Sequence, residues 1–299
     1  MLKLDSCCKT YRVGAFGGGE LLAVHDVSFE VAPGEVVSLI GESGSGKSTI
    51  GKMILRLLRV SRGTIRFEGT DISALEGRQL KEYYANVQGV FQDPFSSYNP
   101  IFKADRVFTM LRHAYFSELS ASKWNAKLES SLDAVSLNPG DVLGKYPHQL
   151  SGGQLQRLLI ARALLLDIRL LVADEVISML DASTRIDVLN LLGDLKGRGL
   201  GILFITHDLS LGNYISDRTM ILRRGCVVEM GATPLVFGNP LHPYTKVLLA
   251  SVPQLHTKWV GIGDSARRRP DDEIGEGAGA LVEIEDGHFV RSTESTTLT

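Results

Sequence analysis

The residues whose types and spacing most clearly indicate chemistry are 41–49, Gly-Glu-Ser-Gly-Ser-Gly-Lys-Ser-Thr. They match the phosphate-binding pattern G-x-x-x-x-G-K-[ST]. Glycines let consecutive backbone N–H groups curl around phosphate oxygens, and a following helix points its positive end at them. Lys47 is expected to reach the β- and γ-phosphates of a nucleotide, and the Ser48 hydroxyl is expected to bind Mg²⁺. The predicted nucleotide-binding residues here are Gly41, Ser43, Gly44, Ser45, Gly46, Lys47, Ser48 and Thr49.

The elements that must position this loop stand on either side of it. The apolar run 36–40 precedes the loop and reads as a strand, and apolar residues recur at helical spacing over 50–58. A strand before and a helix after favour a phosphate-binding loop over a glycine-rich turn that happens to contain a lysine.

A second phosphate-directed pattern begins at residues 150–154, Leu-Ser-Gly-Gly-Gln, which open another apolar-periodic segment. Ser151 is well placed to cap a helix there, and a helix N-terminus rich in serine and glycine attracts anions. This segment cannot serve the phosphate face that Lys47 already holds. Two half-sites in one chain therefore suggest two chains that share nucleotides.

Two further apolar runs end in groups that can do acid–base chemistry. Residues 170–173 read as a buried strand that leads into the carboxylates Asp174 and Glu175, and the run 201–206 leads into His207. Adjacent residues leaving a strand point to opposite sides, so one carboxylate can orient Mg²⁺ while the other faces water. Alone, each would be read as an acidic turn or a structural histidine; their places after the phosphate motifs make them candidates.

Together these motifs resemble the ATP-binding cassette (ABC) ATPases, whose signature reads LSGGQ and whose subunits trap two ATP molecules head to tail. The resemblance implies that Asp174 binds Mg²⁺ with Ser48, that Glu175 is the catalytic glutamate, and that His207 contacts the γ-phosphate. It also implies that the signature touches the ATP held by a partner subunit, through Ser151, Gly152, Gly153 and Gln154.

Two more residues match positions of this family. Gln92 follows the apolar stretch 87–91 and resembles the glutamine that meets the metal ion and water and couples them to a membrane partner. Tyr11 matches the aromatic residue that stacks on adenine, with an ordinary edge-strand tyrosine as the alternative. Two residues depart from the pattern: Val176 replaces a common proline, which is expected to change local stiffness and not chemistry, and Met179 replaces an alanine in the loop that contacts the other subunit.

Composition sets limits on the function. The 299 residues are 44% hydrophobic with a formal net charge of −2 and a pI near 6.4, which argues against nucleic acid as a partner. The three cysteines form no CxxC pair, which favours a reducing compartment and neither zinc nor a disulfide framework. Since no apolar run reaches the roughly 18 residues of a membrane span, the chain is expected at the cytoplasmic face of the membrane, held there by partners.

The predicted fold is α/β: a P-loop ABC ATPase core with an antiparallel β subdomain over 1–92 and 150–235, and a helical subdomain over 93–149. Residues 236–299 are predicted to form a C-terminal extension, with a hairpin over 281–290 around a D-G turn and a mobile linker over 264–279. A glycine-rich hairpin loop is expected at 14–20. The apolar stripes predicted for the helical subdomain are Val107, Met110, Leu111 and Ala114, then Trp124, Leu128, Leu132 and Val135.

The C-terminal sequence carries the subfamily information. Residues 237–245, Phe-Gly-Asn-Pro-Leu-His-Pro-Tyr-Thr, precede an apolar helix expected over 247–253, and together with residues 91–100 they resemble the oligopeptide/dipeptide importer ATPases. Some members of that family carry an iron–sulfur cluster beyond this point. Because residues 259–299 contain no cysteine, no cluster is predicted.

The resemblance implies an ATP-hydrolysing subunit that energises oligopeptide or dipeptide import. Its expected partners are a second ATPase subunit, identical or different, two transmembrane permease subunits and, indirectly, an extracytoplasmic substrate-binding protein. The cofactors are ATP and Mg²⁺. Import of nickel or another small solute, and a soluble ABC ATPase acting on nucleic acid or ribosomes, are the alternatives; the latter usually carries coiled-coil insertions or tandem cassettes. Glu175 and His207 argue against a non-hydrolysing subunit.

Overall fold

A computed structural model describes residues 1–13, 19–251 and 279–292. Its larger sheet has eight strands in the described residues, in the order β11-β12-β10-β9-β3-β8-β7-β6. The five strands from β9 to β6 are parallel, and β10, β12 and β11 continue the sheet antiparallel. In chain order the strands are β3 Val36–Ile40, β6 Val87–Val90, β7 Leu170–Asp174, β8 Gly201–Thr206, β9 Arg218–Arg223, β10 Cys226–Ala232, β11 Leu281–Glu285 and β12 His288–Arg291.

The parallel strands explain why the chain's motifs meet. Every residue of β3, β7 and β8 is buried, as expected for parallel strands covered on both faces. The carboxyl ends of these three strands lie side by side, because β8 pairs with both β3 and β7. The segments that follow them, at residues 41, 175 and 207, therefore come together at one edge of the sheet.

A second, antiparallel sheet packs beside the first, in the order β2-β1-β4-β5. Its strands are β1 Leu2–Arg12, β2 Glu20–Val31, β4 Arg62–Phe67 and β5 Thr70–Asp71. The first two form the predicted hairpin, although most of its glycine-rich loop lies outside the described residues. The side chains of this sheet share one hydrophobic cluster with α1 and one face of the larger sheet.

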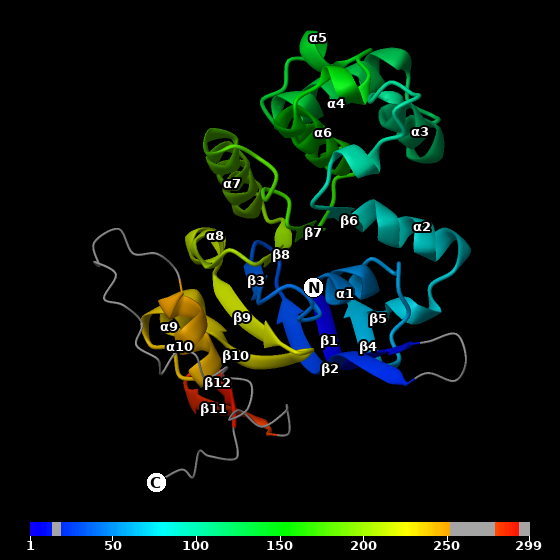
Figure 1. Ribbon diagram of the computed structural model, residues 1–299. Coiled ribbons are helices and arrows are strands. Elements are labelled where there is room, and N and C mark those ends of the chain that lie inside the picture. The colour runs from blue at the N-terminus through cyan, green and yellow to red at the C-terminus, as the bar shows by residue number, and fades with distance from the viewer. Residues whose placement is uncertain (14–18, 252–278, 293–299) are drawn as a thin grey trace.

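Helices surround the larger sheet and build a separate layer at one end (Figure 1). They are α1 Lys47–Ile54, α2 Gly77–Asn86, α3 Arg106–Tyr115, α4 Ala121–Asp133, α5 Pro139–Val142, α6 Gly152–Leu164, α7 Ala182–Gly197, α8 Leu209–Ile215, α9 Thr233–Gly238 and α10 Pro243–Ala250. Short 3₁₀ turns cover Ile72–Ala74, Phe95–Ser97 and Pro147–Gln149. This arrangement confirms the α/β fold. In the helical layer, α6 packs with α3, α4 and α5 (Figure 1).

The helix after the phosphate-binding loop is shorter than predicted. It ends at Ile54, not at residue 58, because Arg56 takes a left-handed φ of 53°. The Arg56 N–H then bonds to the Met53 carbonyl, and the Leu57 N–H bonds to the Lys52 carbonyl, which is a Schellman motif. The apolar spacing continues beyond the end of the helix. Leu57, one of the residues with that spacing, lies past the helix and is 58% exposed.

The first predicted stripe of the helical layer is also partly wrong. Met110 is 61% exposed and Ala114 is exposed, whereas Phe108 is buried. The helix α3 is oriented so that the Phe108 ring enters the core. In the second stripe Trp124, Leu132 and Val135 are buried and Leu128 packs against the same cluster, as predicted.

The C-terminal region follows its prediction in outline. The hairpin of β11 and β12 forms as predicted, with Gly287 at a φ of 72° in its turn. The apolar helix begins at Pro243, four residues earlier than expected, and its predicted end at residue 253 lies outside the described residues, as does most of the linker 264–279. Among the described residues no helix is long and apolar enough to cross a membrane.

Candidate ATP site

The phosphate-binding loop is shaped by two close backbone approaches that only glycine allows. Gly46 has a φ of 105°, and a Cβ there would lie 2.5 Å from the Ala23 carbonyl oxygen. A Cβ at Gly41 would lie 2.1 Å from the carbonyl oxygen of Leu222. The loop is therefore wedged between β2 and β9. Because Ala23 is on β2, the partner strand of β1, Tyr11 lies on the sheet that flanks the loop, opposite Leu21.

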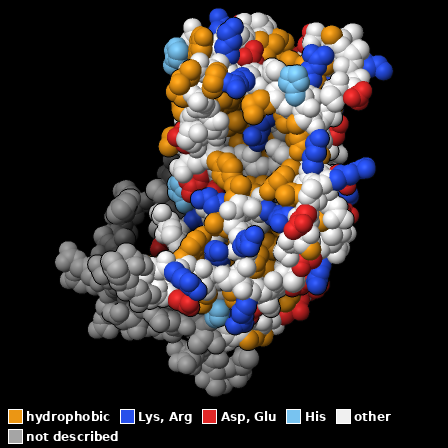
Figure 2. Space-filling view, turned by 90° about the vertical axis from the view of Figure 1, so that its right-hand side faces the viewer, with side chains coloured by type: hydrophobic (Ala, Val, Ile, Leu, Met, Phe, Trp, Pro, Cys, Tyr) orange, Lys and Arg blue, Asp and Glu red, His pale blue; other side chains and the backbone are white. Residues whose placement is uncertain are grey.

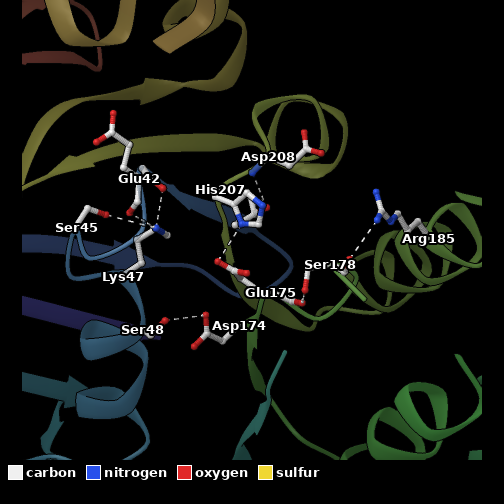
Figure 3. A network of polar contacts seen from close by, with 12 residues as sticks. Glu42, Ser45, Lys47, Ser48, Asp174, Glu175, Ser178, Arg185, His207 and Asp208 are labelled. Atoms are coloured by element: carbon white, nitrogen blue, oxygen red, sulfur yellow. Dashed lines mark hydrogen bonds and ion pairs between the residues drawn. The ribbon is translucent and has the colours of Figure 1, made fainter. Parts of the chain in front are cut away.

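Lys47 folds back on its own loop in this state. Its ammonium group donates to the carbonyl oxygens of Gly41 and Glu42, each at 2.7 Å, and lies 3.5 Å from the Ser45 hydroxyl (Figure 3). Burial lowers the pKa of Lys47, while the carboxylates of Glu175 and Asp174 oppose that shift. A buried ammonium whose hydrogen-bond partners are all uncharged is a ready partner for phosphate oxygens, which carry full negative charge.

Ser48 and Asp174 meet across the site. The Ser48 hydroxyl donates to Asp174 Oδ1 at 3.2 Å (Figure 3). Burial raises the pKa of Asp174, and the hydrogen bond from Ser48 lowers it in part. Two oxygen donors of this kind, one of them a desolvated carboxylate in need of a positive partner, fit a hard cation such as Mg²⁺.

Glu175 and His207 form the third contact of the site. His207 Nδ1 lies 3.1 Å from Glu175 Oε1 (Figure 3). Glu175 holds a left-handed φ of 50°, and its N–H bonds to the Ile205 carbonyl at 2.9 Å, which turns the chain sharply after β7. A non-glycine residue in this region of backbone space is strained, and such strain concentrates at functional sites. The two neighbouring carboxylates have different partners: Asp174 accepts from Ser48, and Glu175 lies beside His207.

Gln92 joins this group through a shared cavity. A cavity of about 310 Å³ is lined by Gln92, Glu175, His207, Asp208, Met179 and Arg185, among others. The structure therefore brings six of the residues singled out from the sequence close together: Lys47, Ser48, Gln92, Asp174, Glu175 and His207. Arg185 was missed. It donates to the carbonyls of Ser178 and Leu180 and so fixes the loop that carries Met179.

The signature residues lie elsewhere, at the start of α6 in the helical layer (Figure 1). The Ser151 hydroxyl accepts from the Gln154 N–H at 3.1 Å, and Gln154 Oε1 accepts from the Ser151 N–H at 2.9 Å. These two hydrogen bonds form a capping box, so the side chains of Ser151 and Gln154 are already bonded within their own chain. Gly153 is buried next to the Thr184 side chain, and the start of α6 lies in the helical layer, apart from the phosphate-binding loop of its own chain (Figure 1).

Comparison with known proteins identifies the family. A family model described as "ABC transporter" matches residues 24–178, just over half of the 299 residues. The chain belongs to the ABC transporter family. A second family model, described as the C-terminal region of oligopeptide/dipeptide transporters, matches residues 228–276 of this ABC ATPase.

Curated relatives agree over nearly the whole length. The oligopeptide transport ATP-binding protein OppF of Streptococcus mutans is 41% identical, covering 98% of this chain and 95% of that protein. The dipeptide transport ATP-binding protein DppF of Lactococcus lactis is 39% identical, covering 96% and 92%. The ATPase domain and these relatives show an enzyme that binds ATP and hydrolyses it in coupling to transport.

Solved structures agree on the fold. A dimeric structure of the cassette MJ0796 in a post-hydrolysis state, bound to ADP and Pi, has a TM-score of 0.69 at 29% identity and covers 78% of this ABC ATPase and 99% of that chain. A second dimeric structure of the same bacterial cassette has a TM-score of 0.70 at 29% identity over the same shares. Cassettes of this family thus form dimers.

Two further polar residues of the ABC ATPase support the site and were missed from sequence. Arg162 donates to the Gly89 carbonyl at 2.9 Å, and Gln156, fully buried, donates to the Phe91 carbonyl at 3.5 Å. Both sit on α6, so the helix that begins with the signature is hydrogen-bonded to β6 and to Phe91, the residue before Gln92. Their spacing matches the apolar face of α6, and nothing in the sequence marks a contact with a strand some 70 residues away.

Proposed function

We propose that this ABC ATPase energises import of oligopeptides or dipeptides from the cytoplasmic face of the membrane, as one of two ATPase subunits bound to a pair of transmembrane permeases. An extracytoplasmic binding protein would deliver the cargo. The match of residues 228–276 to the oligopeptide/dipeptide transporter region carries this proposal, because ATP chemistry does not constrain that segment. The names of the relatives support it.

The proposed chemistry follows from the contacts described above. Glu175 Oε2 or Oε1 would accept a hydrogen bond from water and orient it for in-line attack on the γ-phosphate, with His207 beside it to contact that phosphate. Lys47 would exchange the Gly41 and Glu42 carbonyls for phosphate oxygens. Ser48, Asp174 and Gln92 would hold Mg²⁺, which neutralises phosphate charge when bound. Tyr11 would stack on adenine.

The second half of each ATP site would come from the other subunit. Since the signature is remote from the loop of its own chain, we infer that Ser151, Gly152, Gly153 and Gln154 act on the ATP of the facing subunit. The dimeric cassette structures support this arrangement. A homodimer and a heterodimer with a second ATPase subunit are both compatible with it.

The experiment that tests the importer function is purification from detergent-solubilised membranes, followed by uptake in reconstituted vesicles. Two polytopic proteins should accompany the chain, and labelled di- or oligopeptides should accumulate with ATP. Uptake of nickel and not of peptides would contradict the cargo. Recovery with DNA or ribosomes and without a membrane protein would contradict the importer function and leave the ATPase function intact.

We expect Lys47→Ala to weaken ATP binding by the isolated chain about 100-fold. Loss of a charged contact to phosphate costs about 3 kcal/mol, and each 1.4 kcal/mol is a factor of ten in affinity. Isothermal titration with ATP measures the effect. Lys123→Ala, exposed on α4 in the helical layer, is the control and should bind like the parent. Equal binding by Lys47→Ala would contradict the assigned role.

The surface proposed to receive the permease lies in residues 93–149. Phe95, Ile101, Phe102 and Met110 are exposed there, with Ile101 at 76%. Figure 2 shows hydrophobic side chains at the surface of the helical half of the molecule, on the side where α3 lies. Tyr98 differs from them, because its hydroxyl is buried and its ring packs against the core.

We therefore expect Ile101→Glu to release the permease while leaving ATP binding unchanged. A carboxylate in a desolvated apolar contact costs several kcal/mol, so co-purification should fall about tenfold or more. Pull-down from solubilised membranes measures it, with Ile284→Glu, exposed on β11, as the matched control. Full recovery of the permease with Ile101→Glu would place the contact elsewhere. Tyr98→Glu is unsuitable, since it would disturb packing.

A further inference from the structure

The segment Leu-His-Pro-Tyr-Thr at 241–245 has no part in the ATP chemistry, yet three of its backbone N–H groups are hydrogen-bonded to side chains. His242 precedes α10, and its Nδ1 accepts from the Tyr244 N–H at 3.1 Å. Burial lowers the pKa of His242 to about 4, so the ring stays neutral and can accept. Pro243 occupies the first position of the helix, where its missing N–H is not needed. This segment is thus a helix start.

A buried carboxylate ties that helix start to the large sheet. Glu229 on β10 is fully buried and accepts from the N–H groups of Leu241 and His242, each at 2.9 Å. His288 on β12, also fully buried, lies with its Nε2 2.8 Å from Glu229 Oε1. One carboxylate therefore joins β10, the β11–β12 hairpin and the two residues that precede α10. Breaking such a buried network leaves polar groups unpaired at low dielectric, so the position of α10 is fixed.

The fixed helix places Tyr244 against the strand that leads into the phosphate-binding loop. Tyr244 is 5% exposed and packs in one hydrophobic cluster with Ile40, the residue directly before Gly41. The guanidinium of Arg223 stands 4.9 Å from the centre of the Tyr244 ring. Arg223 follows Leu222, whose carbonyl abuts Gly41. The Tyr244 ring thus lies next to the point where β3 ends and the phosphate-binding loop begins.

Tyr244 also borders the tip of the loop. Tyr244 and Val247 line a cavity of about 350 Å³ together with the loop residues Glu42, Ser43, Gly44 and Ser45 and with Arg223 and Arg224. The Tyr244 hydroxyl is buried beside Glu42, and burial together with that carboxylate raises the pKa of Tyr244 to about 12. Figure 3 shows the Glu42 carboxylate pointing away from Lys47, while the Glu42 carbonyl holds the Lys47 ammonium. Glu42 therefore stands between Tyr244 and Lys47.

We propose that Tyr244 is a positioning residue for the phosphate-binding loop, through which the C-terminal segment 233–250 and the β11–β12 hairpin set the affinity of the site for ATP. The proposal rests on the proposed role of residues 41–49 as the ATP site. Binding of ATP requires Lys47 to leave the Glu42 carbonyl, so the loop must rearrange at a point that Tyr244 borders. By linkage, bound ATP must change the stability of α10 by the same free energy with which α10 changes ATP binding.

The first test compares Tyr244→Ala and Tyr244→Phe with the parent chain. We expect Tyr244→Ala to raise the Kd and KM for ATP about tenfold, because the loop loses its lateral support, while kcat of the assembled transporter stays within about twofold. Tyr244→Phe keeps the ring and should show a smaller rise. Tyr115→Ala, on α3 and remote from the loop, is the matched control for the Kd of the isolated chain. A Tyr244→Ala protein that is less stable but binds ATP with the parent Kd overturns the proposal.

The second test uses the unaltered chain and does not depend on how the variants fold. Hydrogen exchange of the backbone amides of 244–250 is followed with and without a non-hydrolysable ATP analogue. Slower exchange with the analogue, by about threefold or more, supports the coupling; unchanged exchange overturns it. If the unaltered chain binds no nucleotide at all, the proposed ATP site itself fails. The Lys47→Ala titration separates that outcome from a failure of the Tyr244 coupling.

Discussion

Replacing Glu175 by glutamine will leave ATP bound and stop its steady-state hydrolysis. The substitution keeps the size of the side chain and removes only the charge that can orient and polarise water. The phosphate cradle consists of the loop around Lys47 and the Ser48–Asp174 pair, and none of their hydrogen bonds involves the Glu175 side chain. Loss of a general base costs about 10²–10⁴ in rate, so phosphate release should fall by at least about 100-fold.

The measurement is phosphate release by the assembled transporter, with ATP affinity measured in parallel. Glu82→Gln, on the exposed face of α2, removes the same charge away from the site and should hydrolyse ATP at the parent rate. A His207→Ala variant tests the neighbouring group, which lies 3.1 Å from Glu175. Phosphate release near the parent rate by Glu175→Gln would show that another group orients the water.

The candidate site residues that sequence and structure both bring together are those whose positions depend on local geometry. Gly41 and Gly46 are required because neighbouring carbonyls approach too closely for a Cβ. Both are the fixed glycines of the pattern G-x-x-x-x-G-K-[ST], so the sequence identifies them. Asp174, Glu175 and His207 follow buried strands, and parallel strands bring their carboxyl ends together. Local pattern and sheet topology were therefore enough to assemble the centre of the site.

The errors arose where a single residue overrode the pattern. Apolar spacing continued to residue 58, but the left-handed conformation of Arg56 ended α1 at Ile54, and arginine gives no hint of that conformation. In α3 the spacing favoured Met110, whereas packing selected Phe108, whose larger ring fills more of the core. Neither choice can be read from periodicity, since both depend on which neighbours the helix meets.

Contacts between distant polar residues were beyond prediction for a different reason. Arg162 with Gly89, and Glu229 with His288, join residues that are far apart in sequence and whose partners include backbone carbonyls that every residue has. A sequence shows which groups can form hydrogen bonds but not which of many equivalent groups they meet. The role of α6 as a link between the signature and Gln92, and the role of Tyr244, therefore emerged only from the structure.

Introducing a carboxylate at Gly152 is expected to abolish hydrolysis without changing ATP binding by the isolated chain. Gly152 is the first residue of α6, where backbone N–H groups point outward and the helix end attracts anions. A Cβ at this position meets only the Phe95 ring, at 3.9 Å, so the substitution has room. Gly153 is a poorer choice, because a Cβ there would lie 2.7 Å from Thr184 Cγ2.

The physical basis is repulsion between charges in a closed interface. If the signature faces the γ-phosphate of the other subunit, the carboxylate of Gly152→Asp would lie near that phosphate when the dimer closes. Like charges in a partly desolvated contact cost about 3 kcal/mol or more, which corresponds to about a 100-fold loss of closed dimer and of phosphate release. The loop that binds ATP in the same chain is untouched, so the Kd for ATP should stay within about twofold of the parent value.

Gly152→Ala separates charge from size. Alanine adds the same Cβ, favours the helix and carries no charge, so closure and hydrolysis should remain close to those of the parent. Closure is measured by sedimentation of Glu175→Gln chains with ATP, with and without each Gly152 substitution, so that hydrolysis does not reopen the dimer. If Gly152→Asp instead weakens ATP binding by the isolated chain, the signature acts on the ATP of its own subunit. The remote position of α6 in Figure 1 argues for the first outcome, because a helix start held in a separate layer by its own capping box can reach phosphate only on a facing molecule.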